Sequence, residues 1–176
     1  MGKREEEKKP RREKDFYATI DPDAIVPKLV DHLRGKTYAE PCYGDGDLED
    51  QLMEVAVCKW RSDVRETVGS SKVMDALEIE RQDLQNIDYI VTNPPYDWKL
   101  LKPLLDHLPT LKPTWLLLPA DMMHNKRMGP YMKRCAWVLS VGRLYWMDNE
   151  IKGVDNYAWY RFHQFDYGYD TRFVGR

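Results

Sequence analysis

A short apolar segment that ends at two consecutive prolines constrains the fold of this 176-residue chain more than any other feature. Residues 88–92 read Asp-Tyr-Ile-Val-Thr and predict a buried strand, which is followed by Asn93, Pro94, Pro95 and Tyr96. Proline fixes its own φ angle and has no amide hydrogen, so a central strand does not continue through this pair. The strand must therefore end before the prolines, and the side chains that follow are held in a rigid turn.

Strand and helix patterns alternate along much of the chain. Apolar residues at helical spacing follow Asp21, which we expect to cap a helix that ends at Gly35. Further strands are predicted at residues 36–40, 57–63, 73–74 and 115–118, and further helices at 48–55, 99–107 and 126–135. Two aromatic strands, at 139–147 and 157–165, predict an antiparallel hairpin at the edge of the sheet. Because strands that alternate with helices form right-handed βαβ units, we expect an α/β fold with a mostly parallel central sheet.

The amino-terminal segment differs in composition from the rest of the chain. Residues 1–14 are almost all charged and cannot bury apolar area, so we expect a disordered tail. Residues 15–176 are expected to form one domain, without a separate domain for target recognition. No segment approaches the roughly 18 apolar residues of a membrane span, which predicts a cytoplasmic protein without membrane contact. The three cysteines and four histidines lack the spacing of metal ligands, so we expect no metal site.

A glycine-containing turn lies between the predicted strand at 36–40 and the predicted helix at 48–55. Residues 40–46 read Glu-Pro-Cys-Tyr-Gly-Asp-Gly and stand at the carboxyl end of a strand, where open α/β sheets bind ligands. The spacing differs from the dinucleotide fingerprint and lacks the Gly-Lys-Ser/Thr of a phosphate loop. Glu40, Asp45 and Asp47 would repel phosphate. The turn therefore favours a cationic nucleoside without phosphates.

The Asn-Pro-Pro-Tyr turn can place two carbonyl groups near one point. The side-chain carbonyl of Asn93 and the backbone carbonyl of Pro94 can accept both hydrogens of a planar NH2 group. These two hydrogen bonds would draw the nitrogen lone pair out of conjugation and direct it at an electrophile. Tyr96 can stack on the ring, as aromatic side chains do in base-flipping enzymes. We therefore expect Asn93, Pro94, Pro95 and Tyr96 to be the catalytic residues for chemistry at an amino nitrogen.

These motifs resemble those of class I S-adenosyl-L-methionine (SAM)-dependent methyltransferases, and within that class the DNA adenine-N6 enzymes. The matching segments are Phe16–Thr19 for motif X, Glu40–Gly46 for motif I and Asn93–Tyr96 for motif IV. Their order resembles the gamma arrangement, and the overall pattern is similar to that of small enzymes from phages and prophages. The resemblance covers about residues 15–165. It implies a Rossmann-like fold, S-adenosyl-L-methionine as methyl donor, and the cytoplasm of a bacterial or phage-infected cell.

The resemblance also implies roles for individual residues. The cofactor-binding residues that it implies are Phe16, Tyr17, Thr19, Glu40, Gly44, Gly46, Asp63, Asp75 and Asn93. Asp63 stands where an acid of the family binds the ribose hydroxyls, and Asp75 stands where another binds the adenine amino group. Proline often follows the motif X threonine in the family, whereas Ile20 stands here. The expected substrate-binding residues are Tyr96, Trp98 and, in the densest basic region of the ordered chain, Lys126 and Arg127.

The sequence leaves the substrate open. The first hypothesis is methyl transfer to N6 of adenine in double-stranded DNA. The alternatives are an amino methyltransferase that acts on RNA, protein glutamine or cytosine N4, and an inactive protein that binds cofactor, DNA or a partner. The net charge of −2 weakens a nucleic-acid hypothesis, although a local basic patch can suffice. Without a recognition domain, specificity would be loose or would come from a homodimer or a partner protein.

Overall fold

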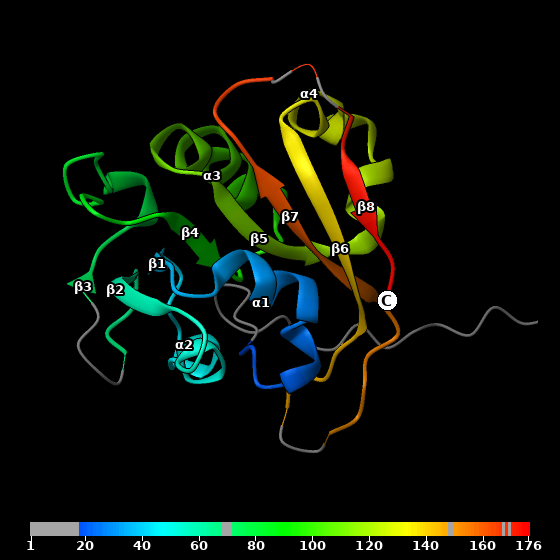
Figure 1. Cartoon of the computed structure of the whole chain (residues 1–176), viewed down its shortest axis with the longest axis horizontal. Helices are drawn as coiled ribbons and strands as arrows, with labels where there is room; N and C mark the ends of the chain where they lie inside the picture. The colour runs from blue at the N-terminus through cyan, green and yellow to red at the C-terminus, as the bar shows by residue number, and fades with distance from the viewer. Residues whose placement is uncertain (1–17, 68–71, 148–149, 167, 169) are drawn as a thin grey trace, which may run out of the picture.

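The computed structural model describes residues 18–67, 72–147, 150–166, 168 and 170–176. Its centre is an eight-stranded sheet with the order β3-β2-β1-β4-β5-β7-β6-β8 (Figure 1). The strands are β1 (Thr37–Glu40), β2 (Val57–Asp63), β3 (Lys72–Val73), β4 (Tyr89–Thr92), β5 (Thr114–Pro119), β6 (Cys135–Arg143), β7 (Asn156–Phe162) and β8 (Arg172–Val174). Among these strands β7 alone is antiparallel to its neighbours. The expected α/β fold with a mostly parallel sheet is therefore confirmed.

Helices cover both faces of the sheet. The helical segments are η1 (Pro22–Ala24), α1 (Pro27–Leu33), α2 (Asp47–Leu52), η2 (Ala76–Glu78), α3 (Trp98–Leu111), η3 (Ala120–His124), η4 (Lys126–Met128) and α4 (Gly129–Met132). Apolar side chains of α1 and α2 pack against one face, and those of η2, α3 and α4 pack against the other. The largest fully buried side chains include Trp115 of β5 and Trp159 of β7, which belong to the core cluster that packs against α1 and α2. This three-layer arrangement leaves the carboxyl ends of β1, β2 and β4 for the loops described below.

The first predicted helix is divided into two segments. Asp21 caps only the short turn η1, where its Oδ1 accepts a hydrogen bond from the Asp23 amide at 2.9 Å. Pro27 then begins α1, because a proline at the first helical position lacks only an amide hydrogen that would have no partner there. Gly35 follows the helix with φ at 69°, a left-handed conformation that glycine adopts without steric cost. The predicted cap at Asp21 and the predicted helix end at Gly35 are correct, but the single helix expected between them is divided into η1 and α1.

The carboxyl-terminal strands differ from the prediction in position and bounds. The hairpin does not form the edge of the sheet, because β7 lies between β5 and β6 and the unpredicted β8 pairs with β6. The strand predicted at 139–147 occupies 135–143, and its register shifts near Gly142, whose φ is 96°. Leu144 is buried in a loop rather than in a strand, so an apolar pattern alone misplaced the strand end.

Two helices also differ in length from their predicted ranges. The helix predicted at 99–107 extends from Trp98 to Leu111, although Pro103 and Pro109 lie inside it. The segment predicted as a helix at 126–135 contains only the short η4 and α4, and β6 begins at Cys135. Within the described part of the chain, no helix is both long enough and apolar enough to cross a membrane.

Candidate cofactor and amine site

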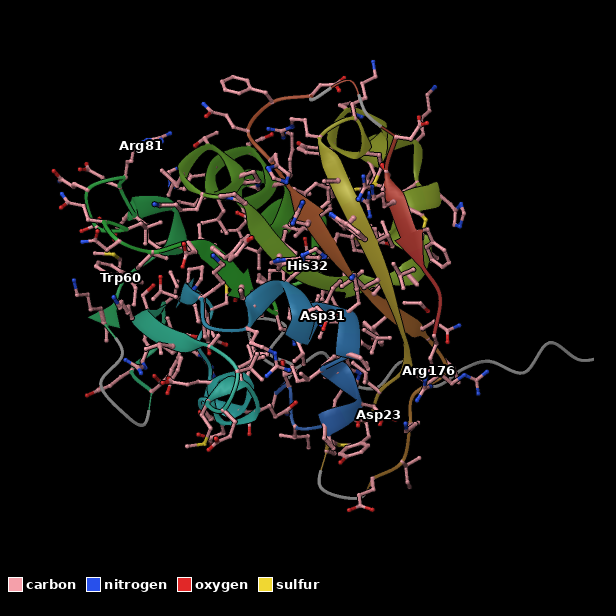
Figure 2. The ribbon with its side chains drawn as sticks, in the orientation of Figure 1. Asp23, Asp31, His32, Trp60, Arg81 and Arg176 are labelled. Atoms are coloured by element: carbon pink, nitrogen blue, oxygen red, sulfur yellow. The ribbon has the colours of Figure 1, made fainter. Side chains whose placement is uncertain are left out.

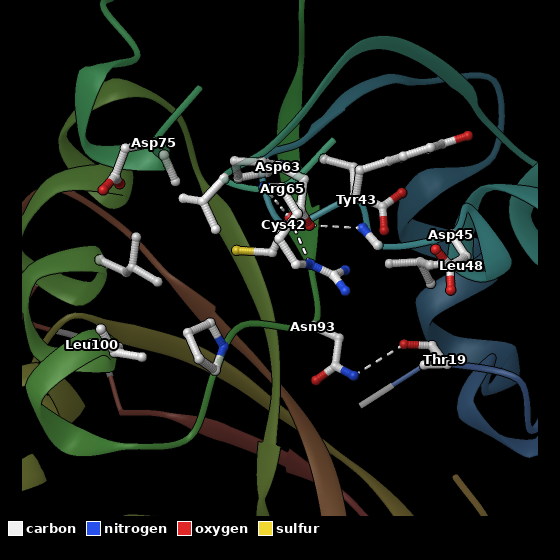
Figure 3. Close-up of a pocket in the computed structure, with 18 of the residues that line it drawn as sticks. Thr19, Cys42, Tyr43, Asp45, Leu48, Asp63, Arg65, Asp75, Asn93 and Leu100 are labelled. Carbon is white, nitrogen blue, oxygen red and sulfur yellow. Dashed lines mark hydrogen bonds and ion pairs between the residues drawn. The ribbon is translucent and has the colours of Figure 1, made fainter. Parts of the chain in front are cut away.

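A cavity of about 500 Å³ opens at the carboxyl ends of β1, β2 and β4 (Figure 3). Seven residues of the predicted site line it: Thr19, Glu40, Gly44, Asp63, Asp75, Asn93 and Pro95. Gly46 does not line the cavity but begins α2 beside it, and Pro94 is buried behind it. Phe16 and Tyr17 lie outside the described residues, as does the predicted tail. Segments that are far apart in the sequence are therefore brought together around one space.

The glycine turn is tied to the end of β2. The Gly44 amide donates a hydrogen bond to Asp63 Oδ2 at 3.0 Å, and φ is 60° at Gly44 and 97° at Gly46. A Cβ atom added to Gly46 would lie 2.7 Å from the hydroxyl of Tyr43. Backbone conformation and close contact therefore both require glycine at position 46.

Glu40 brings an unpaired carboxylate oxygen to the cavity. The residue is 2% exposed, and its Oε2 has no hydrogen-bond partner among the described residues. Burial raises the pKa of Glu40 well above its ordinary range, and the nearby carboxylate of Glu49 adds to this effect. Arg61 opposes the rise, but its guanidinium forms a two-point ion pair with Glu49. The carboxylate of Glu40 can therefore still accept a hydrogen bond from a cationic ligand in the cavity.

The two other predicted acids, Asp63 and Asp75, differ in how many of their hydrogen-bond acceptor positions are already occupied. Asp63 is 6% exposed and also accepts from the Arg65 amide at 2.9 Å and from Arg65 Nε at 3.2 Å, both at Oδ1. A carboxylate offers about four acceptor positions, so Asp63 Oδ2 can still take one hydroxyl proton in addition to the Gly44 amide. Asp75 is exposed and uses its Oδ1 to cap η2 through the Leu77 amide at 2.9 Å. Both residues can bind polar groups at the cavity wall.

One end of the cavity is apolar, and its residues were not predicted from the sequence. The residues of this end are Ala76, Leu77, Leu100, Pro103 and Leu104. Figure 3 shows Asp75 and Leu100 at one end of the cavity and Thr19 and Asp45 at the other. Leu77 and Leu100 are 41% and 46% exposed, which is unusual for leucine and suits a surface that a flat ring can cover. The spacing i, i+3, i+4 on α3 was the signal that could have identified this wall.

Asn93 is held in one orientation at the cavity edge. Its Nδ2 donates to Thr19 Oγ1 at 3.1 Å, while its Oδ1 accepts from the Tyr96 hydroxyl at 2.7 Å. Thr19 is 5% exposed, and its backbone carbonyl accepts a hydrogen bond from the side chain of Gln51. The motif X threonine therefore fixes the amide nitrogen, and the amide oxygen points toward Tyr96. An incoming NH2 group would replace the tyrosine hydroxyl as the donor to this oxygen.

Aromatic side chains continue outward from Tyr96. Its ring centroid lies 5.8 Å from that of Tyr157, with the rings tilted by 34°. Trp146 packs edge-on against Tyr157, with centroids 4.8 Å apart. No local sequence pattern predicts that Tyr157 of β7 and Trp146, in the segment between β6 and β7, lie beside the Asn-Pro-Pro-Tyr turn. Tyr157 is only 6% exposed, so the half-buried Tyr96 is the ring beside Asn93 on which a planar group can stack, and Tyr157 supports it from the core.

The other predicted substrate residues lie together but outside the cavity. The Arg127 guanidinium stacks over the Trp98 ring at 4.4 Å, and Tyr131 meets the same ring edge-on at 6.1 Å. Lys126 and Arg127 are exposed, and the exposed Lys99 lines the cavity itself. A basic surface therefore begins at the amino end of α3, next to the Asn-Pro-Pro-Tyr turn.

Comparisons with known proteins identify the fold. No model of a protein family matches this chain, and no curated protein sequence matches it. A structure from Pyrococcus horikoshii, described as an RNA methyltransferase, matches with a TM-score of 0.58 and 13% identity over 76% of this chain and 77% of that chain. The Mtq2–Trm112 complex of E. cuniculi, named as responsible for methylation of the termination factor eRF1, gives a TM-score of 0.50 and 15% identity over 80% and 99%. The fold is that of the class I methyltransferases.

A third structure extends the range of described substrates. The modification subunit described for a type I restriction enzyme of Vibrio vulnificus gives a TM-score of 0.51 and 9% identity. The match covers 91% of this chain and 47% of that subunit, so this chain spans about half of the subunit's length. At these identities the likeness is one of fold, and substrate and reaction must be argued from the site itself.

Proposed function

We propose that this chain transfers a methyl group from S-adenosyl-L-methionine to the exocyclic N6 of adenine in DNA. The observation that carries this proposal is the fixed orientation of the Asn93 amide at the edge of the cavity. Its carbonyl oxygen faces an aromatic surface, and a planar NH2 group is the donor that fits between a carbonyl and a ring. Asn93 and the neighbouring backbone carbonyl of Pro94 would hold that group by both hydrogens.

The cavity fits S-adenosyl-L-methionine from end to end. This cofactor carries an amine and a sulfonium but no phosphate, which suits the acids Glu40 and Asp45 at one end. Asp63 retains capacity for a ribose hydroxyl. The apolar wall of η2 and α3, with Asp75 beside it, fits a purine ring and its amino group. When bound, the cofactor supplies an activated methyl group.

The residues of the chain act mainly by positioning. Asn93 and Pro94 hold the target nitrogen so that its lone pair points into the cavity, and this orientation lowers the entropic part of the barrier. The Tyr96 hydroxyl leaves Asn93 when the amine arrives, and its ring then stacks on the base. The nucleophile is the substrate nitrogen itself: its lone pair would take the methyl group as the carbon–sulfur bond of the cofactor breaks, and the nitrogen would then lose its extra proton to water. No nucleophile from the protein is needed. Cys42, the cysteine of the cavity wall, has its pKa raised to about 12 by burial and stays a thiol.

The basic surface favours a polyanionic substrate. Arg127 is stacked on Trp98 and keeps its charge exposed, beside Lys126 and near Lys99. Such a surface suits a phosphate backbone better than a neutral peptide segment. The described methyltransferases of the same fold include enzymes for RNA and for a protein, and guanine, cytosine and glutamine also carry planar NH2 groups. The test below therefore includes these substrates.

The decisive experiment measures label transfer from methyl-labelled S-adenosyl-L-methionine to unmethylated double-stranded DNA, followed by nucleoside analysis. We expect labelled N6-methyladenine. Asn93→Ala should lower the rate at least 100-fold, because one preorganised donor or acceptor is worth about that factor, and cofactor binding should remain measurable although Asn93 lines the cavity. Gln85→Ala, at an exposed site outside the cavity, is the matched control and should retain full activity.

Each contrary result has a defined meaning. Cofactor binding without label in DNA contradicts the DNA proposal, and label in RNA or at protein glutamine would identify the alternative. Cofactor binding without label in any of these substrates supports an inactive binding protein. Full activity of Asn93→Ala overturns the assignment of the catalytic motif.

A further inference from the structure

A second cavity lies at the opposite edge of the sheet. Its volume is about 400 Å³, and its lining comes from the start of β6, the end of β7, the start of β8 and His32 near the end of α1. Since β6 and β8 are parallel and β7 runs against them, this edge holds the amino ends of the parallel strands. The first cavity lies at their carboxyl ends, and the two cavities share no lining residue. The proposed methyl transfer has no use for the second cavity.

The lining of this second cavity is strongly basic. Lys133, Arg134, Arg161 and Arg172 line it, with Asp170 as the single carboxylate. The whole chain carries a net charge of −2, so this concentration does not reflect a general excess of basic residues. Arg134 donates to two backbone carbonyls, which fixes its position without neutralising its charge. Within the described residues, Lys133 and Arg172 form no ion pair.

Aromatic rings hold the cations in place. The Trp137 ring centroid lies 5.2 Å from the Arg172 guanidinium and 5.8 Å from that of Arg161. Arg161 also lies 5.5 Å from the Trp115 ring. Cation–π contacts orient a guanidinium but leave its positive charge intact. The arginines are therefore preorganised around a concave space that retains a positive potential.

Two histidines add hydrogen-bonding capacity to the same space. His32 lies on α1 (Figure 2). Its ring packs against Trp115 and Trp137 with centroid distances of 5.2 and 4.7 Å, and its buried Nε2 has no hydrogen-bond partner among the described residues. His163 lines the cavity from the end of β7. Burial lowers the pKa of both imidazoles, and the charge of Arg161 lowers it further. A ligand of negative charge would oppose the effect of Arg161 on both rings.

We propose that the second cavity is a binding site for a phosphate group. Guanidinium groups match phosphate oxygens with paired hydrogen bonds, and Arg161 of β7 and Arg172 of β8 flank Trp137 from the two strands on either side of β6. The volume exceeds that of a single phosphate, so the site has room for the group that carries it. The phosphate can belong to a nucleic-acid backbone or to a free nucleotide. The proposal does not rest on the proposed methyl transfer, because the two cavities are separate.

The four histidines of the full-length protein provide the test. NMR would follow their ring protons against pH with inorganic phosphate, and with chloride at equal ionic strength. An anion within hydrogen-bond distance should raise the pKa of His32 and His163 by about one unit or more. His107 and His124 do not line the cavity and should be unaffected. Equal shifts in phosphate and chloride, or no shift of His32 and His163, would overturn the proposal without any variant.

A matched pair of double variants tests the cations. Arg172→Gln with Lys133→Gln removes two exposed charges from the cavity and should weaken phosphate binding at least tenfold. Lys59→Gln with Arg143→Gln removes two exposed charges elsewhere and should leave phosphate binding unchanged. Equal affinity in both double variants contradicts the site.

The source of the phosphate is decided by competition between two probes. A short duplex DNA that shifts both histidines at lower concentration than a mononucleotide identifies a backbone site. The reverse order identifies a site for a free nucleotide. Cofactor affinity at the first cavity should be the same in both double variants. This readout keeps the second site distinguishable from failure of the proposed methyl transfer.

Discussion

Glu40 stands at the carboxyl end of β1 with a buried carboxylate oxygen that has no partner among the described residues. Burying a carboxylate without a partner opposes ionisation, which is why its pKa is raised. Glutamine has the same shape and no charge, so it would occupy the position at lower cost. A carboxylate at this position therefore does not favour the stability of the free protein, and the proposed cationic cofactor would give it a partner.

Glu40→Gln should stabilise the free protein and weaken cofactor binding. Because the pKa of Glu40 is higher in the folded than in the unfolded chain, its favourable contribution is complete below the unfolded pKa of about 4.3 and is lost as pH rises through the folded pKa. The glutamine variant does not lose this stability, so the difference in unfolding free energy between the variant and the wild type should grow from pH 5 to pH 8. We expect about 1 kcal/mol at pH 8, a rise in Tm of roughly 2–4 °C, and at least a tenfold loss of cofactor affinity.

Thermal unfolding across this pH range and calorimetric titration of the cofactor would check both effects. Glu54→Gln, at an exposed position of no assigned role, is the control and should change neither quantity. A Glu40→Gln variant that is less stable at pH 8, or that binds cofactor as tightly as the wild type, would show that Glu40 has a structural partner.

Some site residues could be predicted from the sequence because their chemistry is local. Glu40 is the last residue of β1 and Asn93 directly follows β4, so strand prediction alone placed both at the carboxyl ends of strands. Tyr157 and Trp146 were not predicted as part of the site. Their contact with Tyr96 depends on β7 lying between β5 and β6, and no local pattern encodes that order.

Among the secondary-structure elements, α2 depends most on the turn before it. This helix has six residues and begins at Asp47, directly after its N-cap Gly46, whose φ of 97° directs the chain from the glycine turn into the helix. Isolated helices of this length are unstable in water, so packing and a correct start must hold it. Leu48 and Leu52 are buried, and Tyr43 covers Gly46.

Gly46→Ala and Gly35→Ala separate backbone strain from close contact. Both glycines have positive φ, but a Cβ at Gly35 meets no atom within 4 Å, whereas one at Gly46 meets the Tyr43 hydroxyl at 2.7 Å. Each variant should lose about 1–2 kcal/mol of unfolding free energy, measured by denaturant titration. Only Gly46→Ala should also displace Tyr43 and lower cofactor affinity, by about fivefold or more. Equal cofactor affinity in the two variants would contradict a role of the turn in the cofactor site.

The presence of most strands could be predicted from the sequence, whereas the residues at which they end were predicted less well. The strand patterns at 36–40, 57–63 and 115–118 correspond to β1, β2 and β5, because short apolar runs between polar turns fit a buried sheet. The end of β6 was misplaced because Leu144 is buried from a loop, and burial alone does not distinguish a loop from a strand. The three-residue β8 has no apolar pattern, and it forms by pairing with β6.

The whole molecule places its two basic surfaces at different ends of the sheet. The second cavity lies at the amino ends of the parallel strands, and the Lys126–Arg127 surface lies next to the Asn-Pro-Pro-Tyr turn. The glycine turn of the first cavity is instead acidic, because Asp45 and Asp47 line the cavity there. A duplex that presents adenine to Asn93 would therefore meet its first phosphate contacts at Lys126 and Arg127, and not at the glycine turn.

The salt dependence of DNA binding tests this arrangement. Each phosphate neutralised by a protein cation contributes about −0.9 to the slope of log K against log salt concentration. Lys126→Gln with Arg127→Gln should therefore make the slope less steep by about 1.8 and lower affinity at low salt, with cofactor affinity unchanged. The Lys59→Gln/Arg143→Gln variant has the same change in net charge at exposed sites away from the motif and should keep the wild-type slope. If both double variants lose the same part of the slope, DNA responds to overall charge, and the surface beside Trp98 does not determine where the duplex binds.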